Sequence, residues 1–521
     1  MGLPAVEASF RKLTAASHGH VPFPHEGDRW LAALRRFGYQ LLRHARDTYG
    51  PTHTPLFVCQ LDIDAKRLPR SDSTLYAPAN RGGAGPRMNN LQFDFGLVRF
   101  LDALSRVTGN SQYSDAVTEY LSYYFAELPD EGPERARGLW PWGDHRGYDV
   151  VRDEIIGGAH EFKRDWPPWG RFWQVDSKAV RREIEGLARH IYDRSKSWGF
   201  SRHFPSGHTY THSMPSSGGA YVAAWAFLYE KTGEGKYLEW AEGLRDYFWR
   251  IRDQDTDLLA AHPADPAYPA NMQHHRMSLR ALRTEYMGQL IDFGPLLLRT
   301  AEVLGPEEGP EFRRQGLAYI RSFATRMDIQ ADGSFYATFD LDTGAPLFAR
   351  VKPSQGWTFV PQMSEKYNWG NRVLPLRAPI TLAFSYKMTG ADDLRRYFDR
   401  LQPLFDLEYF ADPTAERRDI PAGLMAQAIT AFMNMYQGSG EISYLEKAHI
   451  LARYAMQHYY VSGWFVCGPS PLARYKAPGL NTWRLYSNRG GSPNLALSLL
   501  RLHLVSAGED DFVDDNPMCY W

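Results

Sequence analysis

The stretch FLDALSRVTGNSQYSDAVTEYLSYYF, residues 100–125, contains two helical patterns of apolar residues that are separated by a short turn. The same arrangement recurs in AWAFLYEKTGEGKYLEWAEGLRDYF, residues 224–248. Turns this short join only antiparallel neighbours, so each stretch predicts a helical hairpin. Weaker copies of the pattern follow at residues 296–320, 383–405 and 432–456. The chain is therefore expected to consist of repeated helical hairpins.

A glycine stands at the expected end of the first helix in each copy. The C-terminus of a helix favours a residue that tolerates positive φ, and glycine does so without steric cost. We expect this role for Gly109, Gly233, Gly305, Gly390 and Gly438.

Two further elements are predicted between these repeats. Residues 176–198 should form a helix, because apolar side chains recur there at helical spacing. The stretch DGSFYATFDLDTGAPLF, residues 332–348, has the alternation of a β-hairpin, with Asp342-Thr343-Gly344 as its turn. The residues expected on the inner face of the 176–198 helix are Val180, Ile184, Leu187 and Ile191.

Repeated helical hairpins either stack as an open solenoid or close into a ring. Uneven spacing of the repeats, with long aromatic loops between them, favours closure. We therefore predict a mainly α fold, an (α/α) toroid or barrel of repeated helical hairpins with small β-hairpin insertions. The chain has no βαβ alternation, and no linker rich in Pro, Gly or Ser divides it. Residues 1–521 are accordingly expected to form a single catalytic domain.

Charge and composition narrow the classes of partner. The formal net charge of −1 argues against nucleic acid and against an anionic membrane surface, since both favour a basic excess. An acidic substrate stays possible, because a small basic cleft can lie in a neutral protein. The stretch MGLPAVEASFRK lacks the layout of a secretory signal, so we expect a soluble, cytoplasmic protein, or a periplasmic or secreted one if a leader was removed. The three cysteines are too far apart for a disulfide framework or a Cys-based zinc site.

Aromatic residues are frequent, with 15 Trp, 30 Tyr and 28 Phe among 521 residues. Many stand in loops beside Gly, Pro and Arg, as in LWPWGDHRGYD (139–149) and DWPPWGRFW (165–173). Such rings either stack on sugars or pack in the core, and packing is the commoner use.

Four residues in the first half form a pattern with chemical meaning. They are His145 in GDHRGYD, Glu161 in GGAHEFKRDWP, and the adjacent pair Arg202-His203 in GFSRHFPSGH. Their order, together with the text from GGAHEFKRDWPPWGRFWQVD to WGFSRHF, resembles the family 2 pectate lyases over roughly residues 90–250.

That resemblance implies a metal-assisted polysaccharide lyase that cleaves uronic-acid glycans by β-elimination. It implies that His145, Glu161 and His203 hold a divalent metal, manganese being the family's usual ion, and that Arg202 is the base. The ligand types alone also suit Fe(II), Ni or Zn. Arginine is an unusual base because its side chain is protonated in almost any setting, and a nearby dication in a low-dielectric cleft favours the neutral form.

Each of the four residues also has an ordinary structural interpretation. His145 could support a loop or stack on Trp142, and Glu161 could pair with a neighbouring Lys163 or Arg164. Arg202 could bind a substrate carboxylate without acting as the base. Asp144, directly before His145, departs from the family pattern, and His160 is the nearest substitute ligand.

Other polar and aromatic residues are candidates for binding an acidic oligosaccharide or polysaccharide. Without the resemblance, we would nominate as base His208, His212 or Tyr210 in HFPSGHTYTHS (203–213), or Lys163. Basic and aromatic residues also alternate in NMQHHRMSLR (271–280), EKYNWGNR (365–372) and PLARYKAPG (471–479). This alternation suits an acidic glycan, but for any one residue a solvated surface is the commoner explanation. The candidate substrate-binding residues are Lys163, His208, Tyr210, His212, His275, Arg276, Trp369 and Arg474.

Other functions fit the same predicted fold. A glycoside hydrolase or unsaturated-uronide hydrolase would need two carboxyl groups flanking the bond, for which Asp94 and Glu285 are candidates. A sugar epimerase would use histidines, and a glycan-binding scaffold would need no catalytic residue. A lyase for a different uronate polymer would keep the same machinery, because loops determine specificity.

Overall fold

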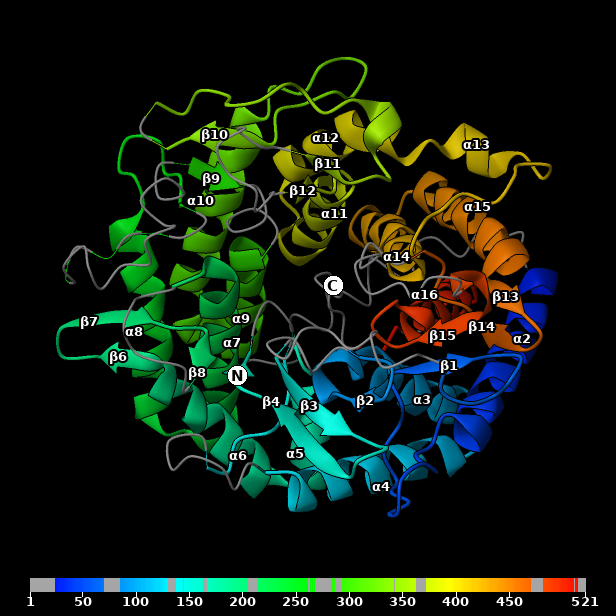
Figure 1. The fold of residues 1–521 in the computed structure, drawn as a ribbon. Helices are drawn as coiled ribbons and strands as arrows, with labels where there is room; N and C mark the ends of the chain where they lie inside the picture. Colours follow the sequence, from blue (N-terminus) through cyan, green and yellow to red (C-terminus); the bar gives the residue numbers. More distant parts are fainter. Residues whose placement is uncertain are drawn as a thin grey trace.

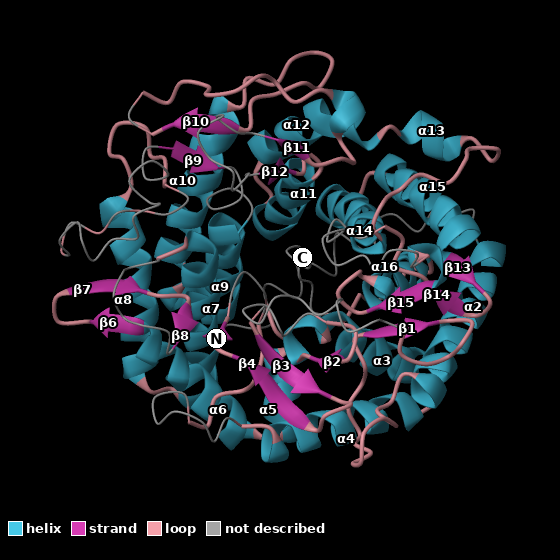
Figure 2. Ribbon diagram, viewed as in Figure 1, coloured by secondary structure: helices cyan, strands magenta, loops and turns pink. Residues whose placement is uncertain are grey.

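The computed structural model describes residues 24–69, 85–129, 137–143, 145–162, 166–204, 213–260, 263, 265, 267, 283–285, 292–341, 343–361, 372–469, 481–509 and 511–513. Within these ranges the chain forms fifteen α-helices, and its strands are only two to four residues long. The helices are arranged as a ring, with the strands lying between their ends (Figures 1 and 2).

The ring has an inner and an outer layer of helices. Inner helices such as α7 are apolar on all sides, because they contact neighbours in the ring as well as their outer partners. The inner layer contains α3 (Phe95–Thr108), α7 (Pro215–Thr232), α9 (Gly294–Glu308), α11 (Arg377–Thr389), α14 (Ala422–Ser439) and α16 (Ser492–Ser506). The outer layer contains α2 (Pro24–His44), α4 (Gln112–Glu127), α8 (Gly235–Ile251), α10 (Pro310–Arg326), α12 (Asp392–Leu401) and α15 (Ile442–Tyr459).

Contacts between the inner helices run around the ring. Helix α16 packs on α3 and α14, α14 on α11, α11 on α9, and α9 on α7. The arc between α7 and α3 holds the short helices α5 (Trp169–Val175) and α6 (Ser177–Gly186), together with the sheet of β2 (Met88–Asn89), β3 (Arg146–Asp149) and β4 (Glu154–Gly157). The predicted mainly α, (α/α) toroid fold is therefore confirmed, and the single-domain assignment stays a prediction.

The five predicted helical hairpins are all present, as α3–α4, α7–α8, α9–α10, α11–α12 and α14–α15. Gly109, Gly233 and Gly390 end their helices in the left-handed conformation, and Gly305 breaks α9 with a φ of +73°. The prediction for Gly438 was wrong, because α14 continues to Ser439 and ends at Gly440. A Cβ at Gly438 would lie 2.9 Å from the Tyr386 ring, so that glycine provides space for helix packing instead.

The prediction of one helix over residues 176–198 was correct only in its first half. Helix α6 begins after Asp176, whose carboxylate accepts hydrogen bonds from two backbone N–H groups, and a 3-10 turn, Leu187–His190, follows it. The chain then forms a hairpin of β6 (Ile191–Asp193) and β7 (Ser197–Phe200). Its turn is stabilised by Asp193, which accepts hydrogen bonds from the backbone N–H and hydroxyl of Ser195. This local turn ends the helical pattern.

The predicted β-hairpin around residue 340 is also present. Isolated bridges join Phe335 to Val351 and Phe339 to Pro346, and Gly344 turns with a φ of +66°. Within it, β10 (Thr338–Asp340) pairs with β9 (Arg283–Glu285). The other short strands pair as β11 (Val360–Pro361) with β12 (Arg372–Val373) and β13 (Tyr460–Val461) with β14 (Trp464–Phe465). The outer short helix α13 (Leu407–Ala411) precedes α14.

Within the described ranges, none of the helices combines the length and the apolar character that crossing a bilayer requires. Cys59 and Cys467 are buried as free thiols, and Cys519 lies outside the described residues.

The two ends of the helical ring meet at a buried polar cluster. Strand β1 (Gln60–Asp62) pairs with β15 (Leu485–Ser487), which joins segments more than 400 residues apart. Beside them, the carboxylate of Asp94 accepts hydrogen bonds from Asn488 at 2.5 Å, Tyr120 at 2.6 Å and Asn89 at 3.0 Å. Asp94, Asn89 and Asn488 have no exposed surface. Asp94 thus connects the start of α3 to the segment that precedes α16.

We predict that Asp94→Ala destabilises the ring more than an ordinary core substitution. The change removes the carboxylate that accepts from Asn488, Tyr120 and Asn89, of which Asn89 also donates to the Phe57 carbonyl. A buried donor left without its acceptor costs about 1–3 kcal/mol. Thermal unfolding followed by circular dichroism should show a midpoint lower by several degrees. The control is Glu302→Ala, which removes an exposed carboxylate on α9 paired with Arg299 and should change the midpoint little. Equal midpoints for the two variants would contradict a closing role for Asp94.

Candidate metal centre

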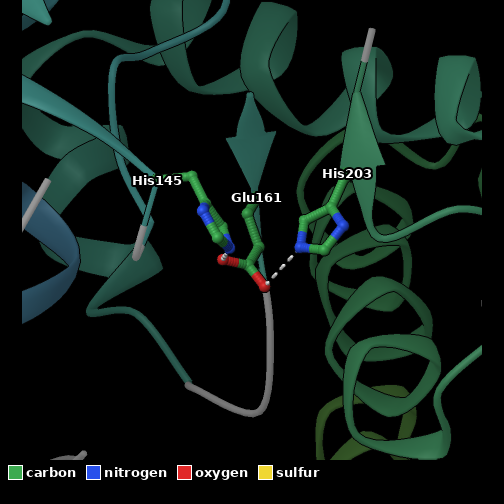
Figure 3. A group of neighbouring side chains, drawn as sticks. All are labelled: His145, Glu161 and His203. Atoms are coloured by element: carbon green, nitrogen blue, oxygen red, sulfur yellow. Dashed lines mark ion pairs between the residues drawn. The ribbon is translucent and has the colours of Figure 1, made fainter. Parts of the chain in front are cut away.

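Two short antiparallel strands bring three of the four predicted site residues together. Strand β5 (His160–Glu161) pairs with β8 (His203–Phe204), and Glu161 lies directly opposite His203. Arg202 immediately precedes β8, and His145 immediately precedes β3. Figure 3 shows the Glu161 carboxylate between the two imidazole rings.

Two glycines allow the backbone segments of this site to approach closely. Gly143 has a φ of +101°, and a Cβ there would lie 2.4 Å from the Glu161 carbonyl oxygen. Gly157 has a φ of +100°, and a Cβ there would lie 1.8 Å from the His145 carbonyl oxygen. A side chain at either position would therefore displace His145 from Glu161.

The side-chain distances define a compact cluster. The Arg202 guanidinium Nη1 lies 2.6 Å from Glu161 Oε1, and His203 Nε2 lies 3.4 Å from the same oxygen. His145 Nε2 lies 3.6 Å from Glu161 Oε2. The two imidazole rings meet edge to face, with centroids 4.7 Å apart. Glu161 is completely buried, whereas the other three side chains are 17–19% exposed. The cluster therefore has a buried floor and an accessible rim.

The donor set and its spacing fit a divalent cation. Ligand atoms of His145, Glu161 and His203 all lie within 4.8 Å of one another. A cation bound at about 2.1 Å to donors on one face would separate them by about 3 Å, which needs only small side-chain movements from the distances above. A fully buried carboxylate also needs compensating positive charge, and Arg202 supplies part of it.

The electrostatics of His203 favour its metal-binding form. Burial lowers the pKa of His203 to about 4, and the contact with Glu161 opposes that decrease without overcoming it. At neutral pH the imidazole is therefore uncharged and keeps a lone pair for a cation.

The alternative ligand from the sequence, His160, does not share this cluster. Its ring is 1% exposed and is hydrogen-bonded to Glu183 and His190, away from Glu161. Trp142 does not stack on His145, since its stacked neighbour is Phe162 at 5.2 Å. The remaining candidates, Lys163, His208, Tyr210, His212, His275, Arg276, Trp369 and Arg474, lie outside the described residues, as do Asp144 and Arg164.

Sequence reasoning missed the buried polar residues behind the cluster, above all Glu183 and His190. A signal for Glu183 was present, because it lies three residues after Val180 and four before Leu187, on the face of α6 that was predicted to be buried. A carboxylate at such a position requires a buried partner.

Comparison with known proteins supports the resemblance in the same segment. A family model described as periplasmic pectate lyase matches residues 77–218, which contain His145, Glu161, Arg202 and His203. The predicted partial resemblance is thereby confirmed for that segment.

Solved structures of low sequence identity also match most of the chain. An unsaturated glucuronyl hydrolase from Bacillus sp. GL1 is 13% identical over 91% of this chain and 96% of its own, with a TM-score of 0.44. A sugar epimerase from a ruminal bacterium is 13% identical over 92% and 99%, with a TM-score of 0.44. An inactive α-1,6-mannanase variant of Salegentibacter sp. HEL1_6 is 9% identical over 92% and 100%, with a TM-score of 0.40. At these scores the similarities assign no activity.

We predict that His203 titrates near pH 4 in the metal-free protein, compared with about 6.5 for an unperturbed histidine. The unfolded chain takes up this proton at a higher pH than the native protein, so this group destabilises the fold as the pH falls from about 6.5 to about 4. Long-range ¹H–¹⁵N spectra of histidine-labelled protein, assigned with His203→Gln, would measure the pKa. A midpoint near 6.5 would show that the imidazole is not desolvated.

Proposed function

We propose that this protein is a metal-assisted polysaccharide lyase that cleaves uronic-acid-containing glycans, of the pectate or oligogalacturonide type, by β-elimination. The observation that carries the proposal is the convergence of His145, Glu161 and His203 with Arg202, inside the segment that matches the periplasmic pectate lyase model. An enzyme that acts on sugars is the broader form of the same proposal.

The difficulty of the reaction explains the need for these groups. The proton on C5 of a uronate is only weakly acidic while the adjacent carboxylate is ionised. A divalent cation, which we propose to be manganese held by His145, Glu161 and His203, would supply charge that neutralises this carboxylate and the developing enolate. The rim of the cluster is accessible, so a substrate carboxylate can approach it.

Arg202 is the residue proposed to take the proton. With no cation bound, its guanidinium pairs with Glu161 Oε1 at 2.6 Å, and its side chain is partly exposed at the rim. A cation held by Glu161 would compete with this pair and favour the neutral guanidine, which has released one proton to solvent and can accept another. In the elimination the C5–H bond breaks and its proton passes to the guanidine nitrogen. The electron pair forms the C4–C5 double bond as the C4–O4 bond breaks, and O4 takes a proton from water or an acid.

The hydrolase alternative finds little support among the described residues. A hydrolase needs two carboxyl groups beside the scissile bond. Asp94 has no exposed surface and accepts three hydrogen bonds in the ring closure, so it is not available as an acid. The side chain of Glu285 lies outside the described residues.

The comparisons bear on location as well as activity. The matching family is described as periplasmic, which agrees with the periplasmic alternative drawn from the sequence. Nothing among the comparisons supports the cytoplasmic expectation, and we propose a periplasmic protein.

We predict that the protein generates ultraviolet absorbance from unsaturated uronides when it is given polygalacturonate or its oligomers. The activity should disappear with a chelator and return with manganese, because the cation is needed to acidify C5. A panel of other uronates would identify the preferred polymer. The absence of absorbance on every uronate, with manganese present, would exclude elimination and favour a hydrolase or an epimerase.

We predict that Arg202→Ala lowers kcat by about 10²-fold or more, since a positioned general base contributes about 10²–10⁴ to rate. The matched control is Arg321→Ala, which removes an exposed arginine paired with Asp393 between α10 and α12 and should leave the kinetics unchanged. Steady-state kinetics on oligogalacturonides would distinguish the two possible roles of Arg202. A rise in KM with unchanged kcat would show that Arg202 binds the carboxylate and does not take the proton.

A further inference from the structure

A buried hydrogen-bond chain lies directly behind the candidate metal centre. Successive side chains of a strand point to opposite faces, so His160 points away from the cluster that Glu161 joins. His160 Nδ1 lies 2.9 Å from His190 Nε2, and His160 Nε2 lies 2.6 Å from Glu183 Oε1. We refer to these three residues as the Glu183–His160–His190 chain. All three are at most 1% exposed.

One end of the chain is attached to the segment that carries Arg202. His190 Nδ1 lies 2.8 Å from the carbonyl oxygen of Ser201, which can only accept, so this nitrogen donates a hydrogen bond. The backbone N–H of Ser201 in turn donates to the His190 carbonyl at 3.1 Å. Both bonds hold the residue immediately before Arg202.

The other end of the chain is attached to the segment that leads to His145. Glu183 Oε2 accepts a hydrogen bond from the Trp140 backbone N–H at 2.7 Å. The indole N–H of Trp142 is directed at His160 Nε2 from 2.9 Å. The Glu183–His160–His190 chain therefore contacts all three segments from which the metal ligands and Arg202 project.

The stability of the fold does not by itself explain why polar residues occupy these three buried positions. Three buried ionisable side chains carry a desolvation cost, and well-packed apolar residues of similar size are often as stable or more so. Hydrogen bonds, in contrast with apolar contacts, specify distance and direction. The chain includes His160, next to Glu161, and contacts Ser201, next to Arg202. It also contacts Trp140 and Trp142, five and three residues before His145, so its directional bonds act on the segments that carry the site residues.

We infer that the Glu183–His160–His190 chain is a positioning network, which sets the separation of Glu161 from Arg202-His203 and of both from His145. The inference rests on the proposed function, because the quantity that the network controls is the geometry of the metal centre. Residues that orient metal ligands in this way contribute about 10- to 100-fold in metal affinity when they are mutated. The three residues themselves are positioning residues and contact no substrate.

The test compares substitutions of two buried histidines. His190→Ala removes the contacts of the imidazole with His160, the Ser201 carbonyl and the Tyr221 hydroxyl. His190→Asn keeps an amide group near the position of Nδ1 and can retain the bond to Ser201. The matched control is His449→Ala, because His449 is also buried, contacts Ser506 at 2.7 Å and stacks on Trp30. It lies on α15, across the ring from β8 (Figure 1). Glu183→Gln, which preserves side-chain size, provides a second variant if His190→Ala does not fold.

The readouts are manganese affinity by calorimetry, the electron paramagnetic resonance spectrum of bound Mn²⁺, and the midpoint of thermal unfolding. His190→Ala and Glu183→Gln should weaken manganese binding by about 10- to 100-fold and alter the spectrum, with His190→Asn intermediate. His449→Ala should lower the unfolding midpoint by a similar amount without changing affinity or spectrum. The elimination assay should show a lower kcat for the network variants with little change in KM.

The outcomes separate this inference from the proposed function. If the unmodified protein binds manganese and catalyses elimination, but His190→Ala and Glu183→Gln match His449→Ala in affinity and spectrum, the positioning role is overturned and the lyase assignment stands. If the unmodified protein binds no manganese, both are overturned.

Discussion

The packing of α3 against α16 is the contact on which the rest of the structure depends. It joins the first inner helix to the last, so that each inner helix packs against an inner neighbour as well as an outer helix. The pairing of β1 with β15 and the hydrogen bonds of Asp94 reinforce the same junction. A ring closed in this way gives the short strands between its helices a rigid frame. The candidate centre is built on those strands, and strand pairs this short would not be stable without the helices around them.

Within that frame the candidate centre depends on close backbone approach. Gly143 lets the segment before β3 lie against β5, and Gly157 lets His145 lie against β4. The pairing of β5 with β8 places His203 opposite Glu161. The cost of burying the Glu161 carboxylate is reduced by the positive charge of Arg202. The rigid elements behind the site, α6 and the 3-10 turn that follows it, supply Glu183 and His190. The positions of the site side chains are thus set by packing and hydrogen bonds in the buried layer behind the accessible rim.

Much of the fold could be predicted from the sequence, because the repeats combine helical periodicity with a glycine that ends the first helix. Gly109, Gly233 and Gly390 behave as predicted, but Gly438 does not, since its role is to admit the Tyr386 ring. The helix predicted from apolar periodicity over residues 176–198 was also too long. Periodicity does not reveal the turn in which Asp193 accepts hydrogen bonds from Ser195. The candidate metal ligands came from family resemblance, and spacing alone would not have brought residues 145, 161 and 203 together. Polar partners such as His190 become visible only when the tertiary contacts are known.

The ion pair between Arg202 and Glu161 has a consequence for how any cation enters this centre. The oxygen Oε1 of Glu161 already interacts with a positive group at 2.6 Å, and His203 Nε2 approaches the same oxygen. A dication that binds there competes with the guanidinium for one carboxylate, so loading is an exchange between two positive charges. The free energy of cation binding is then the difference between the interaction of the cation with Glu161 and that of Arg202 with Glu161. An Arg202 side chain released by the incoming cation becomes free to turn toward the substrate. In that case one equilibrium determines both the fraction of protein that holds a cation and the fraction whose Arg202 is released from Glu161.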